Sequence, residues 1–156
     1  MRLALTLFLL ALSSAAQTPK RNLVQLDVPD QIEAHAGKEV EVPVKFWVAD
    51  GYHINSNKPT EEYMIPTKVE WQASPLKHVG DVFPTADQRA FGFTKGKKLS
   101  VFEGTRTLKA RFAVPASSAS GTLTLEGIFR YQACDQAACY PPGKVAIKVA
   151  VKVVDR

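Results

Sequence analysis

Two cysteines, Cys134 and Cys139, are the residues of this sequence whose type and spacing point most directly to chemistry. Four residues separate them, and the first of these is Asp135, a residue type common in tight turns. If the two cysteines close a four-residue hairpin loop, they stand opposite each other at a Cα separation that a disulfide accepts. The chemistry that this arrangement allows is the reversible oxidation of two thiols to one disulfide.

Such a disulfide is either a structural staple, the common case in exported domains, or a redox-active pair. A bond across so short a loop gives about 2 kcal/mol by the loop-closure relation, against nearly 5 for a loop on the order of 100 residues. Cys134 has the phase of Gln132 rather than that of the core-facing Tyr131, so we expect its sulfur to point outward and be reachable. An incoming thiolate needs that access. These arguments leave both interpretations open.

Other site chemistries find less support in the residues. A metal site would combine the cysteines with His35, His53 or His78, but the spacing matches no familiar zinc pattern and oxidised cysteines cannot bind a metal. A copper carrier usually offers several methionines, and only Met64 follows the N-terminal segment. No Ser-His-Asp order, glycine-rich phosphate loop or paired carboxylates stand out. We therefore expect neither a metal nor a cofactor.

The N-terminal segment is typical of a secretory signal peptide. Residues 1–16 contain one positive charge at Arg2, an apolar run over residues 3–12 and small residues up to Ala16. The run is shorter than the about 20 residues that cross a bilayer. We expect cleavage near Ala16, which leaves residues 17–156 as one periplasmic or secreted domain without stable membrane insertion.

The charge pattern argues against a nucleic-acid partner. The sequence has a formal net charge of +5, but its lysines are scattered along the chain rather than gathered in one stripe. Scattered lysines are typical of the solvated faces of strands.

Four segments alternate apolar and polar residues with the period of two that is typical of half-buried strands: residues 39–48, 105–114, 123–131 and 145–153. Weaker strand candidates, bounded by turn residues, are residues 23–28, 52–55, 67–72 and 77–82. No segment shows a helical period. Seven to nine short strands without helical crossovers predict an all-β fold, an immunoglobulin-like antiparallel β-sandwich.

Residues 83–98 form the longest stretch without a clear strand pattern. Phe91 and Phe93 lie on either side of Gly92 within it. Long loops in compact domains are often functional, and this one suits a segment that covers a site and can lift away. The alternative is a surface loop whose aromatic side chains pack at the edge of the core.

The residues around the cysteines resemble a known family. The strings Tyr131-Gln132-Ala133-Cys134 and Cys139-Tyr140-Pro141-Pro142 are similar to those of the N-terminal periplasmic domain of the transmembrane thiol reductant DsbD. The similarity extends upstream to Asp50-Gly51-Tyr52 and to the loop near Phe91-Gly92. It thus covers nearly all of the chain after the signal peptide, and the family's immunoglobulin-like fold agrees with the predicted strands.

The resemblance implies a function and roles for the two cysteines. In that family the N-terminal domain takes electrons from a thioredoxin-like domain of the same protein and passes them to oxidised periplasmic thiol proteins. Carried over, Cys139 would form the mixed disulfide with partners and Cys134 would resolve it. The family also has a cap loop with a shielding aromatic ring, for which Phe91 is our expected counterpart, with Phe93 in the same loop. An alignment on Gly92 instead places Ala90 at that position.

This sequence also departs from the family's pattern. The turn between the cysteines is one residue shorter, and His53 and Asn55 stand where tyrosines are expected. With Tyr131, Gln132, Tyr140 and Pro141, these two residues are the predicted surround of the site.

The sequence contains no membrane-spanning region after the signal and no thioredoxin-like Cys-x-x-Cys domain. We therefore expect a separate electron donor, a thioredoxin-like or membrane thiol reductant, and oxidised periplasmic thiol proteins as acceptors. Whether the protein turns over as a thiol:disulfide oxidoreductase or only relays electrons stays open. The competing interpretation is a non-catalytic β-sandwich binding module in which the cysteines form a structural disulfide.

Overall fold

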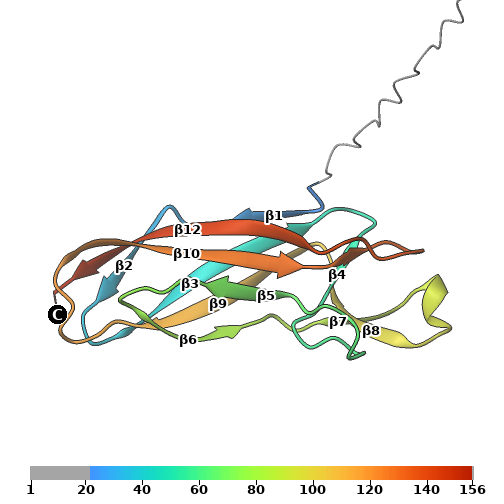
Figure 1. The fold of residues 1–156 in the computed structure, drawn as a ribbon, viewed down its shortest axis with the longest axis horizontal. Helices are drawn as coiled ribbons and strands as arrows, with labels where there is room; N and C mark the ends of the chain where they lie inside the picture. Colours follow the sequence, from blue (N-terminus) through green and yellow to red (C-terminus); the bar gives the residue numbers. More distant parts are fainter. Residues whose placement is uncertain (1–21, 156) are drawn as a thin grey trace, which may run out of the picture.

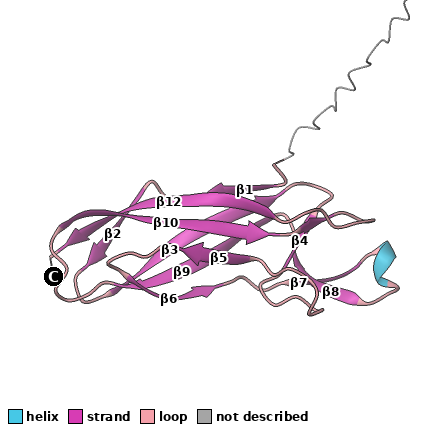
Figure 2. Cartoon of the chain, in the orientation of Figure 1, coloured by secondary structure: helices cyan, strands magenta, loops and turns pink. Residues whose placement is uncertain are grey.

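The computed structural model describes residues 22–155, and the predicted signal peptide, residues 1–16, lies outside them. The described chain forms twelve strands and one short 3-10 turn, η1 (Figure 1; Figure 2). The elements are β1 (Val24–Asp27), β2 (Gln31–His35), β3 (Glu39–Val48), β4 (His53–Asn55), β5 (Lys68–Trp71), β6 (Lys77–Val82), β7 (Asp87–Ala90), η1 (Gly92–Thr94), β8 (Lys98–Phe102), β9 (Thr105–Ala113), β10 (Gly121–Tyr131), β11 (Ala133–Cys134) and β12 (Gly143–Val154). No helix of these residues is both long and apolar enough to span a membrane.

The strands form three four-stranded sheets. The first has the order β1-β3-β9-β6 and the second the order β2-β12-β10-β5, and the two pack face to face as a sandwich (Figure 1). The third, β11-β4-β8-β7, lies at one end of the molecule. All pairings are antiparallel except the one between β12 and β2. The predicted all-β, immunoglobulin-like sandwich is confirmed.

The core follows from the alternation in the four long strands. Their inward positions are buried, and Phe46 of β3 meets Phe129 of β10 across the two sheets with ring centroids 5.2 Å apart. Each such side chain contributes roughly 1.5–3 kcal/mol when it leaves water. The buried set from these strands is Val42, Val44, Phe46, Val48, Leu108, Ala110, Phe112, Leu125, Phe129, Tyr131, Ile147, Val149, Val151 and Val153.

The small third sheet connects this core to the cysteines. β10 ends at Tyr131, and after Gln132 the chain pairs with β4 instead, as β11. Because side chains alternate along a strand, one face of the third sheet directs Ile54, Phe102 and Ala133 into the main core. The opposite face carries the polar and sulfur-bearing side chains that make up the site.

Two expectations about the elements need correction. The structure has more strands than the seven to nine expected, because β2, β7, β8 and β11 have only two to five residues each, too few for a period of two to stand out. Residues 83–98 were expected to be a loop, yet they include β7 and η1 and reach the start of β8. β7 is an edge strand with mostly exposed polar residues, so its sequence shows no buried face.

Candidate functional site

The two cysteines form a disulfide across a hairpin, as their spacing predicted. Their Cα atoms lie 3.9 Å apart, and the bond links Cys134 to Cys139. The Asp135 N–H donates to the Ala138 carbonyl (2.9 Å) and the Tyr140 N–H to the Ala133 carbonyl (2.8 Å). Hydrogen bonds in these places make the cysteines a non-hydrogen-bonded pair of an antiparallel ladder, the position where opposed side chains come closest.

The Asp135 carboxylate organises the four-residue turn between the cysteines. It accepts hydrogen bonds from the Tyr140 hydroxyl (2.6 Å) and from the N–H groups of Ala137 (2.7 Å) and Ala138 (2.9 Å). These bonds, the one from Tyr140 first, lower the pKa of Asp135 to about 2. The hydrogen bond to Asp135 raises the pKa of Tyr140 to about 12, because ionisation would remove the donated proton and would also place two negative charges side by side.

The two sulfurs differ in access. Cys134 shares the outer face of its sheet with Gln132, as its phase predicted, but it is 0% exposed, so the prediction that it is reachable is wrong. The cause is a second layer of side chains over this face, which the local sequence pattern did not predict. Cys139, on the other side of the hairpin, is exposed. An incoming thiolate therefore meets Cys139 first.

His53 belongs to the layer beside Cys134. The two residues are directly opposite in the β4–β11 pairing, and the imidazole stacks on the Phe91 ring with centroids 3.9 Å apart and planes at 13°. Only 1% of His53 is exposed. Burial lowers its pKa to about 4, against a weaker opposite effect of Asp135, so the ring is neutral at pH 7. Its Nε2 has no hydrogen-bond partner within residues 22–155.

Asn55 and Gln132 link three segments around the hairpin. The buried Asn55 amide donates to the Ile65 carbonyl (2.9 Å) and to Gln132 Oε1 (3.2 Å). Gln132 Nε2 in turn donates to the Tyr140 carbonyl (3.2 Å). Side chains of two predicted surround residues therefore hold the backbone that follows Cys139.

The predicted cap loop lies against the site. Phe91 is 5% exposed and packs in a cluster with Met64, Leu99 and Val101, whereas Phe93 is 41% exposed and stacks on Phe91. Ala90, the alternative shielding position, is exposed.

The cap loop also reaches the hairpin turn. A Cβ placed on Gly92 would stand 3.8 Å from the Gln136 carbonyl oxygen, which is ordinary contact distance. Thr94 fixes the conformation of this segment, since its hydroxyl oxygen accepts from the Phe91 N–H (3.1 Å) and lies 2.9 Å from the Phe91 carbonyl. The loop therefore rests on both the His53 side and the turn side of the disulfide.

The remaining predicted surround residues divide between the core and the surface. Tyr131 packs in the main core, and its ring lies over Gly143, where a Cβ would stand 2.4 Å from the ring. Only glycine fits there. Pro141 and Tyr140 are exposed, and the Tyr140 ring lies 5.9 Å from that of Tyr52.

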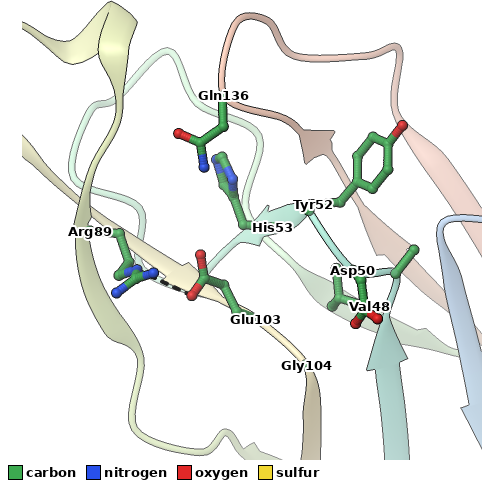
Figure 3. Close-up of a pocket in the computed structure, with 10 residues that line it drawn as sticks. Val48, Asp50, Tyr52, His53, Arg89, Glu103, Gly104 and Gln136 are labelled. Atoms are coloured by element: carbon green, nitrogen blue, oxygen red, sulfur yellow. Dashed lines mark ion pairs between the residues drawn. The ribbon is translucent and has the colours of Figure 1, made fainter.

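A pocket beside His53 brings in residues that the sequence did not single out (Figure 3). Its volume is about 280 Å³, and Arg89 Nε and Glu103 Oε2 form an ion pair across it at 3.2 Å. Arg89 belongs to β7 and Glu103 directly follows β8, and no short-range signal revealed the pairing of these two strands. The lining residues are Val48, Ala49, Asp50, Gly51, Tyr52, His53, Arg89, Glu103, Gly104 and Gln136.

The fold and the site together define an immunoglobulin-like β-sandwich with a disulfide hairpin covered on one side. No protein-family model matches the sequence, and no curated protein matches it either. Among solved structures, the N-terminal periplasmic domain of ScsB from Proteus mirabilis is similar, with a TM-score of 0.59 and 10% identity over 85% of this chain. This chain spans 48% of that one, about half its length.

Two further solved structures are similar with lower TM-scores. One is a chain from the complex between the DsbD N-terminal and PilB N-terminal domains from Neisseria meningitidis, with 18% identity, a TM-score of 0.49, and coverage of 87% of this chain and 88% of that one. The other is the seventh ScaB type I cohesin from Pseudobacteroides cellulosolvens, with 14% identity, a TM-score of 0.49, and coverage of 85% and 93%. At 10% identity, the likeness to the ScsB domain is one of fold.

Proposed function

We propose that this protein is an exported thiol–disulfide exchange protein that relays reducing equivalents through Cys134 and Cys139 to other extracytoplasmic thiol proteins. The observation that carries the proposal is the unequal exposure of the two sulfurs, with Cys139 open and Cys134 buried. Exchange proceeds by attack of a thiolate on one sulfur while the other leaves, so a single accessible sulfur defines the order of events. The sequence resemblance around both cysteines supports the same function.

In this mechanism the reduced protein starts with two thiols. The Cys139 thiolate attacks the disulfide of an oxidised partner, and one partner sulfur leaves as a thiolate. Cys134 then attacks Cys139 Sγ, the bond between Cys139 and the partner breaks, and the partner departs fully reduced. Two electrons have moved from this protein to the partner, and the Cys134–Cys139 disulfide is restored. A separate thiol reductant, thioredoxin-like or membrane-bound, returns the pair to the dithiol.

The cap loop limits which thiols can reach the Cys134 side of the disulfide. Phe91 covers the Cys134 side of the disulfide through its stack on His53, and the loop contacts the turn near Gln136. A partner that displaces the loop gains access from both sides, whereas a small thiol meets only the Cys139 side. Shielding of this kind protects Cys134 from direct attack and leaves Cys139 as the point of entry.

Trapping with single cysteine variants tests the proposal. Cys134→Ser leaves Cys139 able to form a mixed disulfide that nothing resolves, so we expect partners to become disulfide-linked to it in the exported compartment. The matched control Cys139→Ser keeps only the buried sulfur and should trap none. Equal yields of trapped partner from both variants would contradict the assignment of Cys139 as the cysteine that forms the mixed disulfide. Capture that survives replacement of both cysteines would point to a binding module instead.

The reduction potential gives an independent measurement. Structural disulfides of secreted proteins typically lie below about −300 mV, where the glutathione pool does not reduce them. We expect the Cys134–Cys139 bond to equilibrate with glutathione above that value. A bond that stays oxidised throughout such a titration would rule out the relay.

A further inference from the structure

His53 is a buried ionisable side chain to which the exchange mechanism has so far given no role. It is 1% exposed, and its Nε2 has no hydrogen-bond partner among the described residues. Buried polar atoms in native proteins are nearly always paired, and an exception calls for an explanation such as a catalytic or redox role. The nitrogen is thus free to take a proton or a hydrogen bond in another state of the site.

The register places this imidazole beside one particular sulfur. Residues directly opposite in an antiparallel pair project to the same face, with Cβ atoms roughly 4.5–5.5 Å apart. His53 is opposite Cys134, so the ring and that sulfur share the outer face of the third sheet. Phe91 closes the same face by stacking on the imidazole. Figure 3 shows the His53 ring rising from its strand toward Gln136 of the disulfide hairpin.

We propose that His53 is the proton acceptor for the Cys134 thiol when Cys134 resolves the mixed disulfide, a role that rests on the proposed function. The thiol proton passes to the imidazole, and the Cys134 sulfur forms its bond with Cys139 Sγ. The bond between Cys139 and the partner sulfur breaks, and the electron pair leaves with the partner sulfur. That sulfur takes up one proton, and the imidazolium releases one. The protein loses two electrons and the partner gains two.

Among the charged neighbours of the His53 ring, Cys134 is the group whose charge changes when the disulfide is reduced. Burial keeps the imidazole neutral while the disulfide is intact, with a pKa of about 4. A thiolate directly opposite would favour the protonated ring. Arg89 and Glu103 are paired with each other, and Asp135 is held by the hairpin turn. Cys134 lies directly opposite His53 and Asp135 acts on its charge, and the other ionisable residues of the pocket beside the ring are Asp50, Tyr52, Arg89 and Glu103.

Titration of the histidines by NMR tests the coupling in the native protein, without any substitution. The chain has three histidines, and His35 and His78 are exposed and serve as internal references. We expect the titration midpoint of His53 to rise by at least about one pH unit when the disulfide is reduced, because transfer of the Cys134 proton to the ring leaves a thiolate that favours the charged imidazolium. The His35 and His78 curves should superimpose between the two redox forms. A His53 midpoint that does not change on reduction would overturn the proposal.

Reaction of the reduced protein with 5,5′-dithiobis(2-nitrobenzoate) separates the two cysteine steps. Attack by Cys139 releases one thionitrobenzoate, and attack by Cys134 on the resulting mixed disulfide releases the second. In His53→Gln we expect the second phase to slow at least about tenfold, the low side of general-base effects, while the first stays unchanged. His78→Gln is the matched control and should keep both rates.

The outcomes of this reaction distinguish the two proposals. A second phase as fast in His53→Gln as in the native protein would overturn the role of His53 and leave the exchange function standing. The absence of a first phase in the native protein would count against the exchange function itself.

Discussion

At the scale of single residues, Asp135 does more than its place in a turn suggests. One carboxylate accepts hydrogen bonds from two N–H groups of the turn and from the hydroxyl of Tyr140, so it ties the loop to the segment that follows Cys139. Its pKa of about 2 lies below the ordinary 3.8, which means that folding favours the charged form. The stabilisation is therefore complete above about pH 4 and is lost as the pH falls through 2.

Asp135→Asn should remove this pH dependence. The native protein is expected to lose thermal stability between pH 5 and pH 2 more steeply than the variant, because only the native residue must take up a proton in the folded state. Thermal denaturation of both proteins in the oxidised state, at several pH values in that range, measures the difference. Parallel declines in the two proteins would show that the hydrogen bonds to this carboxylate do not contribute.

At the scale of elements, the third sheet joins two environments. One face adds Ile54, Phe102 and Ala133 to the main core, and the other holds His53, Asn55, Gln132 and Cys134. Phe91 and its cluster cover the second face, whereas Phe83 at the start of the same segment stacks on Phe102 of the core face. The part around Phe91 can therefore lift without exposing the sandwich core, as expected for a locally opening segment.

Phe91→Ala is predicted to open the cap and expose Cys134, the sulfur on the covered side. With Cys139→Ser present in both proteins, so that Cys134 is the single thiol, we expect iodoacetamide to label Cys134 at least about tenfold faster, since about 1.4 kcal/mol less stability in the closed loop gives that factor. The labelling rate is the measurement. Phe93→Ala is the matched control, because Phe93 lies on the same loop but is largely exposed. Equal effects from the two variants would contradict the cover assigned to Phe91.

The strands also show how much of the fold could be predicted from the sequence. Alternation predicted β3, β9, β10 and β12 and the inward phase of each, because one face of each strand is buried against the opposite sheet. β7 and β11 gave no such signal, since one is a polar edge strand and the other has two residues. Their pairings bring Arg89 near Glu103 and His53 opposite Cys134. Contacts of this kind depend on long-range register, which local patterns do not encode.

The candidate site was predicted only in part, because some of its contacts also join segments that are far apart in the sequence. The hairpin and its disulfide followed from spacing, and the outward phase of Cys134 followed from strand period. Its burial did not, because the covering ring of Phe91 comes from a segment more than forty positions earlier in the chain.

At the scale of the whole molecule, the sandwich does not depend on the disulfide for its core. The bond closes a loop at one end, whereas the apolar residues of the two large sheets pack between those sheets. Stability thus comes chiefly from burial of apolar surface in the sandwich.

The double variant Cys134→Ser with Cys139→Ser should remain folded. We expect it to lose about 2 kcal/mol of unfolding free energy, the loop-closure value for so short a ring, in urea denaturation. Phe129→Ala in the core is the comparison and should lose about 3–5 kcal/mol. A double variant that unfolds would identify the disulfide as a structural staple.

The hydrogen bonds on either side of the disulfide have a kinetic consequence. Those of Asp135 with Ala138 and of Tyr140 with Ala133 do not involve sulfur, so they hold the two thiols together after the bond is broken. Each thiol then experiences the other at a high effective concentration, as in a well-oriented intramolecular reaction. In the proposed exchange we therefore expect ring closure by Cys134 to outcompete any free thiol in solution, so that mixed disulfides of the native protein are short-lived.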